Sequence, residues 1–210
     1  PKGIWYTPTP GIWQTVWLEP VPREHYLSEL RLAPDVAGER LLVTPLLNVA
    51  VPRDDLAVRV TALAKGKVAG STIVRVNREG ILKLADVQLW SPESPFLYDL
   101  TAELVRVKPL ATNRTAAPGR ARLRAFGEQE RAAYAKAEVL GTALDSVKSY
   151  FGMRNVSIGP GRKSQQPQLC LNGKAIFQHG PLDQGWWPDG LLTPPSDEAM
   201  VWELNWLKNA

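Results

Sequence analysis

The chain has 210 residues, of which 44% are hydrophobic and 22% charged, an ordinary composition for a globular protein. Its 16 glycines and 18 prolines predict many turns and short strands and argue against a helical bundle. The net charge of +4 is small for a nucleic-acid binder, the single cysteine excludes an internal disulfide framework, and no apolar run is long enough for a membrane helix.

The two ends of the chain have unusual features. The first residue is Pro1 rather than Met, and no signal-peptide pattern follows it. The last residues, 205–210, have the pattern of the middle of a helix. We therefore expect a fragment of a longer protein, and the sequence indicates no cellular compartment for it.

Strand-like runs dominate the first half of the chain. Residues 11–19 nearly alternate β-branched and aromatic side chains and predict a strand that ends at Pro20, within a proline-rich joint at 19–23. Short strands separated by turn residues predict an antiparallel β-sandwich, and the lack of strand–helix alternation argues against a doubly wound sheet. Further strands are predicted at 25–32, 41–51, 56–63, 68–76, 80–84, 96–107 and 146–158.

Residues 108–141 interrupt this rhythm and predict an insertion with a short helix over 128–140. Eight basic residues against two acidic ones lie between Arg106 and Lys136. We interpret this cluster as a solvated insertion. Nucleic-acid binding is the less favoured alternative, because only Phe126 and Tyr134 in this segment could stack on bases.

The last part of the chain has a different pattern. Residues 169–177 predict a hairpin whose tight turn is the pair Asn172-Gly173. A loop rich in Gly, Pro, Trp and Asp follows at 180–195. Ser196 can then cap a helix in which Trp202 and Trp206 share one face. Strand, loop and helix in this order are typical of the start of a βα unit.

Four stretches in this order resemble glycoside hydrolase family 2, the group of β-galactosidases, β-glucuronidases and β-mannosidases. They are Gly-Ile-Trp-Gln-Thr-Val-Trp-Leu-Glu at 11–19, Leu-Trp-Ser-Pro-Glu-Ser-Pro-Phe-Leu-Tyr at 89–98, Asp-Ser-Val-Lys-Ser-Tyr-Phe-Gly-Met-Arg at 145–154 and Leu-Asn-Gly-Lys-Ala-Ile-Phe at 171–177. Their spacing is similar to that of the family apart from the insertion at 108–141.

The resemblance implies a mostly β fold in three parts. Residues 1–21 would be the terminal strand of a jelly-roll sugar-binding domain. Residues 22–160 would be an immunoglobulin-like β-sandwich with the insertion at 108–141. Residues 161–210 would begin a (β/α)8 catalytic barrel.

The resemblance also implies retaining hydrolysis of glycosidic bonds by two carboxylates about 5 Å apart. In the family both are glutamates at the ends of later barrel strands, which would lie beyond Ala210. We therefore expect no catalytic residue, no cofactor and no metal ion in this chain, and no activity from the chain alone.

The loop at 180–190 is the one stretch that the resemblance brings to the substrate, because barrel sites lie at the carboxyl ends of strands. A strand over 175–179 would deliver it there. Many relatives have an Arg-His-rich segment here, whereas residues 183–187 read Asp-Gln-Gly-Trp-Trp, which leaves the sugar open. The alternative is a packed Trp pair and Asp residues that make turn bonds. The candidate substrate-binding residues are His179, Asp183, Gln184, Trp186, Trp187 and Asp189.

The favoured hypothesis is a fragment of a retaining β-glycosidase of carbohydrate metabolism, in which the sandwich is a structural spacer. The expected partner is the carbohydrate substrate of the parent enzyme, with no nucleic acid and no membrane, and with homo-oligomerisation left open. The alternative hypothesis is a stand-alone, non-catalytic β-sandwich module that binds carbohydrate or a partner protein.

Overall fold

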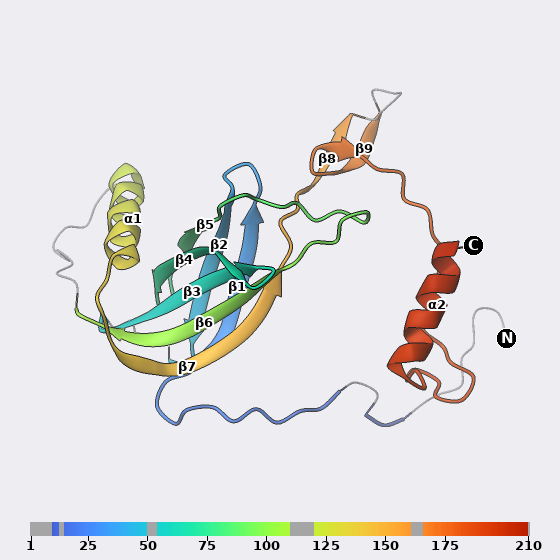
Figure 1. Cartoon of the computed structure of the whole chain (residues 1–210), viewed down its shortest axis with the longest axis horizontal. Coiled ribbons are helices and arrows are strands. Elements are labelled where there is room, and N and C mark those ends of the chain that lie inside the picture. Colours follow the sequence, from blue (N-terminus) through green and yellow to red (C-terminus); the bar gives the residue numbers. More distant parts are fainter. Residues whose placement is uncertain (1–9, 13–14, 50–53, 110–119, 161–165, 210) are drawn as a thin grey trace. The chain divides into compact units, whose positions relative to one another are not determined.

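The computed structural model describes residues 10–12, 15–49, 54–109, 120–160 and 166–209 (Figure 1). Contacts divide the chain into two units, and each is described by itself. The sandwich unit is Val21–Ile176, and the terminal unit comprises Pro1–Pro20 and Phe177–Ala210.

Two antiparallel sheets form the body of the sandwich unit (Figure 1). The three-stranded sheet has the order β1-β2-β5, and the four-stranded sheet has the order β4-β3-β6-β7. The first sheet consists of β1 (Leu27–Asp35), β2 (Arg40–Leu47) and β5 (Gly80–Lys83). The second consists of β3 (Leu56–Ala64), β4 (Lys67–Arg75), β6 (Tyr98–Val107) and β7 (Val139–Phe151).

The main core consists of the alternate side chains that the strands direct toward one another. Burial alternates residue by residue along β2, as expected for a strand with one face in the core. Tyr98 is fully buried, stacks on Phe151 with 5.0 Å between ring centroids, and accepts a hydrogen bond from the backbone N–H of Gln88 at 2.8 Å. The ring of Tyr98 therefore fills space in the core, while its hydroxyl oxygen has a hydrogen-bond partner in the backbone.

The two sheets come close together at β4 and β5. A Cβ added to Gly70 would lie 2.2 Å from the carbonyl oxygen of Lys83, and the N–H of Ala85 donates to the carbonyl of Ala69 at 2.9 Å. Only glycine permits this backbone approach at position 70.

A third, smaller sheet with the order β10-β9-β8 follows the sandwich. Its strands are β8 (Val156–Pro160), β9 (Pro167–Leu171) and β10 (Lys174–Ala175). Asn172 and Gly173 have φ values of 50° and 77°, as a type I′ turn requires, which confirms the predicted hairpin. The single strand predicted over 146–158 is wrong. The chain leaves the large sheet at Gly152, where an added Cβ would lie 3.3 Å from the side chain of Trp90.

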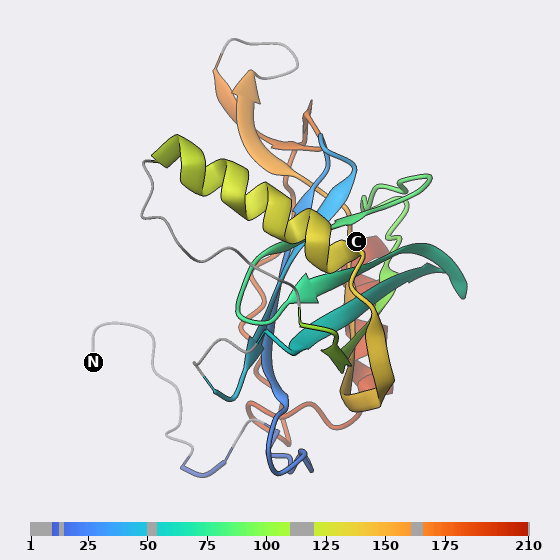
Figure 2. The same cartoon turned by 90° about the vertical axis from the view of Figure 1, so that its left-hand side faces the viewer.

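The insertion contains α1 (Arg120–Ala135), which lies against β4 on the side of the sandwich (Figure 2). The prediction of a helix over 128–140 is wrong at both ends. The helix ends early because Ala137 donates to the carbonyl of Tyr134 in a tight turn, and Val139 already pairs with Val107. Tyr134 and Ala137 are buried in a second apolar cluster with Ala57, Val105 and Val107. Part of the basic cluster predicted in this insertion, at 110–119, lies outside the described residues.

The terminal unit contains α2 (Asp197–Asn209), none of whose residues is buried. The Oγ of Ser196 accepts a hydrogen bond from the N–H of Ala199 at 3.2 Å, which confirms the predicted cap. The strand predicted over 11–19 is absent from the described residues of that stretch, and so is the strand over 175–179 beyond Ala175. A strand requires backbone hydrogen bonds to a neighbouring strand. Within 176–179, the backbone N–H of Ile176 donates to the carbonyl of Leu169 at 3.0 Å, and the pairing goes no further.

The fold class expected from the sequence, an antiparallel β-sandwich in a mostly β chain, is confirmed. None of the helices in the described parts of the chain has the length and apolar character needed to span a membrane.

Candidate functional site

The loop after β10 is held in shape by its own backbone. Trp187 and Leu191 exchange two hydrogen bonds, with N···O distances of 2.7 and 3.1 Å, and Thr193 donates to the carbonyl of Gly190 at 2.9 Å. A Cβ at Gly190 would lie 2.0 Å from the carbonyl oxygen of Thr193, so this turn requires glycine. The second half of the loop is therefore a closed turn that fixes Trp187.

The two predicted carboxylates of the loop make turn bonds. The Oδ1 of Asp183 accepts the N–H of Gly185 at 2.7 Å, and the Oδ1 of Asp189 accepts the N–H of Gly190 at 2.9 Å. Such bonds are those expected of aspartates in turns. The structure thus shows the turn role for both residues, and their contact with a sugar remains a prediction.

The aromatic residues of the loop are accessible. Trp186 is 36% exposed and Trp187 is half-buried. His179 lies beside Phe177 in a stacked arrangement, with 6.4 Å between ring centroids and an interplanar angle of 20°. Phe177 is 91% exposed, and it was not among the residues predicted for the site. Exposed, flat rings of this kind can stack on the C–H face of a pyranose.

The structure does not gather the six predicted site residues around one chemical group. Among the described residues, no hydrogen bond or ion pair joins any two of the side chains of Asp183, Gln184, Asp189 and His179. The described parts of the chain also contain no group of three His, Cys, Asp or Glu side chains placed to hold a metal ion. The loop can offer polar atoms and aromatic surface to a ligand.

Comparisons with known proteins concern the sandwich. Residues 48–115 match the family described as glycosyl hydrolases family 2. Solved structures of the β-glucuronidase from Ruminococcus gnavus in complex with D-glucuronic acid and with uronic deoxynojirimycin share the fold, each with 18% sequence identity, a TM-score of 0.57 and coverage of 89% of this chain. The complex of the same enzyme with C6-substituted uronic isofagomine gives a TM-score of 0.56 at 18% identity and the same coverage.

This chain spans 25% of the enzyme in the first of these structures and 24% in the other two. No curated protein matches the chain. The matched residues include all of β3, β4, β5 and β6, which contribute one strand to the three-stranded sheet and three to the four-stranded sheet. The resemblance stated from the sequence is therefore confirmed over residues 48–115, the segment of the sandwich that matches glycosyl hydrolases family 2.

Proposed function

We propose that this chain is part of a retaining β-glycosidase and that its sandwich is a structural spacer between a sugar-binding domain and a catalytic barrel. The observation that carries the proposal is the family match over 48–115, which falls within the sandwich. The chain's span of about a quarter of the similar glucuronidase structures supports a larger parent.

The interior of the sandwich supports a role as a spacer. Among the residues that the structure describes, no polar or charged residue belongs to the buried core. Catalytic groups usually have perturbed pKa values that arise from burial beside charged partners. A core of this kind supplies rigidity and leaves the chemistry to another part of the enzyme.

The chain alone is proposed to be inactive. Retaining hydrolysis requires two carboxylates about 5 Å apart, one as acid/base and one as nucleophile. Asp183 and Asp189, the carboxylates of the candidate loop, already make turn bonds. In the sandwich, Asp35 and Glu103 form ion pairs with Arg40 and Arg59, at N···O distances of 2.7 and 2.8 Å.

The test begins with the coding sequence beyond Ala210. The proposal expects alternating strand and helix patterns there, with two glutamates at the ends of barrel strands. The parent protein should then hydrolyse one member of a panel of 4-nitrophenyl β-glycosides that includes the glucuronide, and proton NMR should show retention of the anomeric configuration. A stop codon shortly after residue 210, or inversion by the parent, would contradict the proposal.

The alternative is a stand-alone carbohydrate-binding module, which the exposed rings of Phe177 and Trp186 favour. Isothermal titration of the 210-residue chain with oligosaccharides distinguishes the two. A saturable isotherm that is lost in Trp187→Ala would support the module. Turnover of a nitrophenyl glycoside by the 210-residue chain at rates typical of the family would contradict its proposed inactivity.

A further inference from the structure

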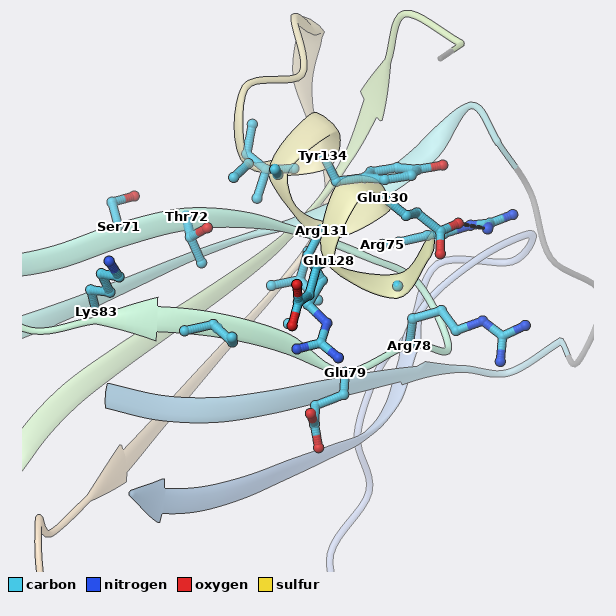
Figure 3. Close-up of a pocket in the computed structure, with 17 residues that line it drawn as sticks. Ser71, Thr72, Arg75, Arg78, Glu79, Lys83, Glu128, Glu130, Arg131 and Tyr134 are labelled. Atoms are coloured by element: carbon cyan, nitrogen blue, oxygen red, sulfur yellow. Dashed lines mark hydrogen bonds and ion pairs between the residues drawn. The ribbon is translucent and has the colours of Figure 1, made fainter. Parts of the chain in front are cut away.

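A cavity of about 610 Å³ lies in the sandwich unit, between α1 and the edge where β4 and β5 meet (Figure 3). Residues 71–75 of β4 and the turn into β5 line one side of it, and residues 127–135 of α1 line the other. The volume is within the range of small-molecule sites, about 300–1,000 Å³. The proposed glycosidase function makes no use of this cavity.

One end of the cavity is closed to a ligand. Tyr134 is 1% exposed there, and Arg75 forms ion pairs with Asp54 and Glu130. The hydroxyl oxygen of Tyr134 and the Nε of Arg75 are buried, so a ligand in the cavity does not reach them. The apolar cluster that contains Tyr134 and the ion pair with Glu130 attach α1 to the large sheet. This end is therefore structural, and a ligand must bind elsewhere in the cavity.

The other end of the cavity offers a free hydroxyl group. Figure 3 shows Ser71 and Thr72 at the end away from Tyr134. The Oγ of Ser71 is hydrogen-bonded to the Oγ1 of Thr61 at 3.0 Å, whereas the side chain of half-buried Thr72 makes no hydrogen bond with another described residue. A hydroxyl both donates and accepts, so the group that matches Thr72 best is a second hydroxyl.

The wall between the two ends carries aliphatic surface. Ile73 and Ile81 contribute from the two sheets and are half-buried, and Ala132 and Ala135 contribute from α1 and are exposed. A flat apolar group placed between the isoleucines and the alanines removes this surface from water, which is favourable. The volume of the cavity fits a body of one or two rings.

The charged side chains of the wall favour a neutral ligand. Apart from Arg75 and Glu130, they carry both signs and form no ion pair with another described residue. An exposed charge attracts an ion only weakly in water, whereas placing an ion on apolar surface costs it hydration. A ligand ion of either sign therefore loses more than it gains. These side chains are Arg78, Lys83 and Arg131 on the basic side and Glu79 and Glu128 on the acidic side.

We propose that this cavity binds a small neutral aromatic alcohol. The ring lies between Ile73 and Ala132, and the hydroxyl of the ligand forms a hydrogen bond with the hydroxyl of Thr72. Tyr134 and Arg75 hold the helix in place and make no bond to the ligand.

Ala132 and Ala133 provide a matched pair of variants. Both are exposed residues of α1, and of the two, Ala132 lines the cavity and Ala133 does not. Ala132→Phe should fill the cavity, whereas Ala133→Phe adds the same ring outside it. Thr72→Val replaces the hydroxyl with a methyl group of similar size and leaves the cavity open.

The experiment is equilibrium dialysis of the whole chain, at neutral pH, with 2-naphthol, naphthalene, 2-naphthoate and 2-naphthylmethylamine. The proposal expects saturable one-site binding of 2-naphthol, at least tenfold weaker in Ala132→Phe and unchanged in Ala133→Phe. Thr72→Val should weaken the binding of 2-naphthol severalfold and leave that of naphthalene unchanged. The carboxylate and the ammonium ion should each bind severalfold more weakly than 2-naphthol.

Three results would overturn the proposal: no saturable binding of 2-naphthol by the original chain, binding of either ion as tight as that of 2-naphthol, or equal binding in Ala132→Phe and Ala133→Phe. Circular dichroism checks that each variant is folded. If Ala132→Phe fails to fold, Thr72→Val decides the question. Unchanged binding of 2-naphthol in that variant, or equal losses for 2-naphthol and naphthalene, would then overturn the proposal.

Discussion

Asn172 ties the small sheet to the sandwich through Trp90, which is 82 residues away in the chain: its Nδ2 donates to the carbonyl oxygen of Trp90 at 3.0 Å. Its Oδ1 accepts the N–H of Asn155 at 2.9 Å, and its backbone adopts the positive φ of the hairpin turn. The ring of Trp90 in turn lies 4.6 Å from the guanidinium of Arg154. One turn residue thus sets the local hairpin and connects it to the loop of the sandwich unit that carries Trp90.

Replacing Asn172 should separate these roles. Asn172→Ala removes two side-chain hydrogen bonds and places an alanine at positive φ, so we expect a loss of about 2–4 kcal/mol in the stability of the small sheet. Asn172→Gly removes the same bonds but tolerates the backbone, and should lose about 1 kcal/mol less. Hydrogen exchange of the Ile176 amide, which donates to the carbonyl of Leu169 in the small sheet at 3.0 Å, measures both losses. Equal losses in the two variants would contradict the role of the backbone.

Arg75 is the next position to test, because its side chain is only 13% exposed and contacts two carboxylates and the ring of Tyr134. Arg75→Met leaves Glu130, whose side chain is 14% exposed, without its partner, and should cost about 3–5 kcal/mol. Adding Glu130→Leu should recover most of this loss, because the uncompensated charge is removed as well. Urea unfolding of the single and double variants checks this. If the losses of the two single variants simply add in the double variant, the unpaired charge of Glu130 is not the source of the lost stability.

Two glycines should respond to alanine in opposite directions. Gly70→Ala puts a Cβ 2.2 Å from the carbonyl oxygen of Lys83 and should destabilise the sandwich by about 1–3 kcal/mol, because backbone must shift. Gly127→Ala is unobstructed inside α1 and should stabilise the chain by about 0.5–1 kcal/mol. Thermal unfolding of both variants shows whether each substitution raises or lowers the stability. A stable Gly70→Ala would mean that β4 and β5 are free to separate.

The features that the sequence predicted well depend on local signals. The turn at Asn172-Gly173 and the cap at Ser196 each follow from one or two residues whose backbone preference is strong. The ends of α1 depend on tertiary packing instead. Composition favoured a helix through 140, but Tyr134 and Ala137 are buried against the outer face of the large sheet, and the chain turns there to begin β7.

The candidate site was less predictable for the same reason. The sequence named Asp183 and Asp189 as sugar ligands or as turn residues, and only the structure shows that each accepts a backbone N–H. The cavity beside α1 left no signal in the sequence. Arg75 and Tyr134 are 59 positions apart, and their shared end of the cavity exists only once the inserted helix lies on β4.

Tyr134 also makes a prediction for the dependence of stability on pH. Burial raises the pKa of its phenol, the charge of Arg75 opposes this, and the carboxylates of Asp54, Glu130 and Asp55 add to it. The folded-state pKa is therefore above that of the unfolded chain, which is about 10. Below about pH 10 the phenol keeps its proton in both states, so it does not change how the free energy of unfolding depends on pH. As the pH rises above it, the unfolded state loses the proton first, so stability falls.

Tyr134→Phe is the variant that isolates this effect. At neutral pH it should change the free energy of unfolding by less than about 1 kcal/mol, because the hydroxyl that it removes has no partner among the described residues. Above pH 10 the original chain should lose stability more steeply than the variant, since phenylalanine does not ionise. Urea unfolding of both between pH 8 and about 11 measures the difference. Parallel curves over this range would show that the phenol of Tyr134 ionises as readily in the folded chain as in the unfolded one.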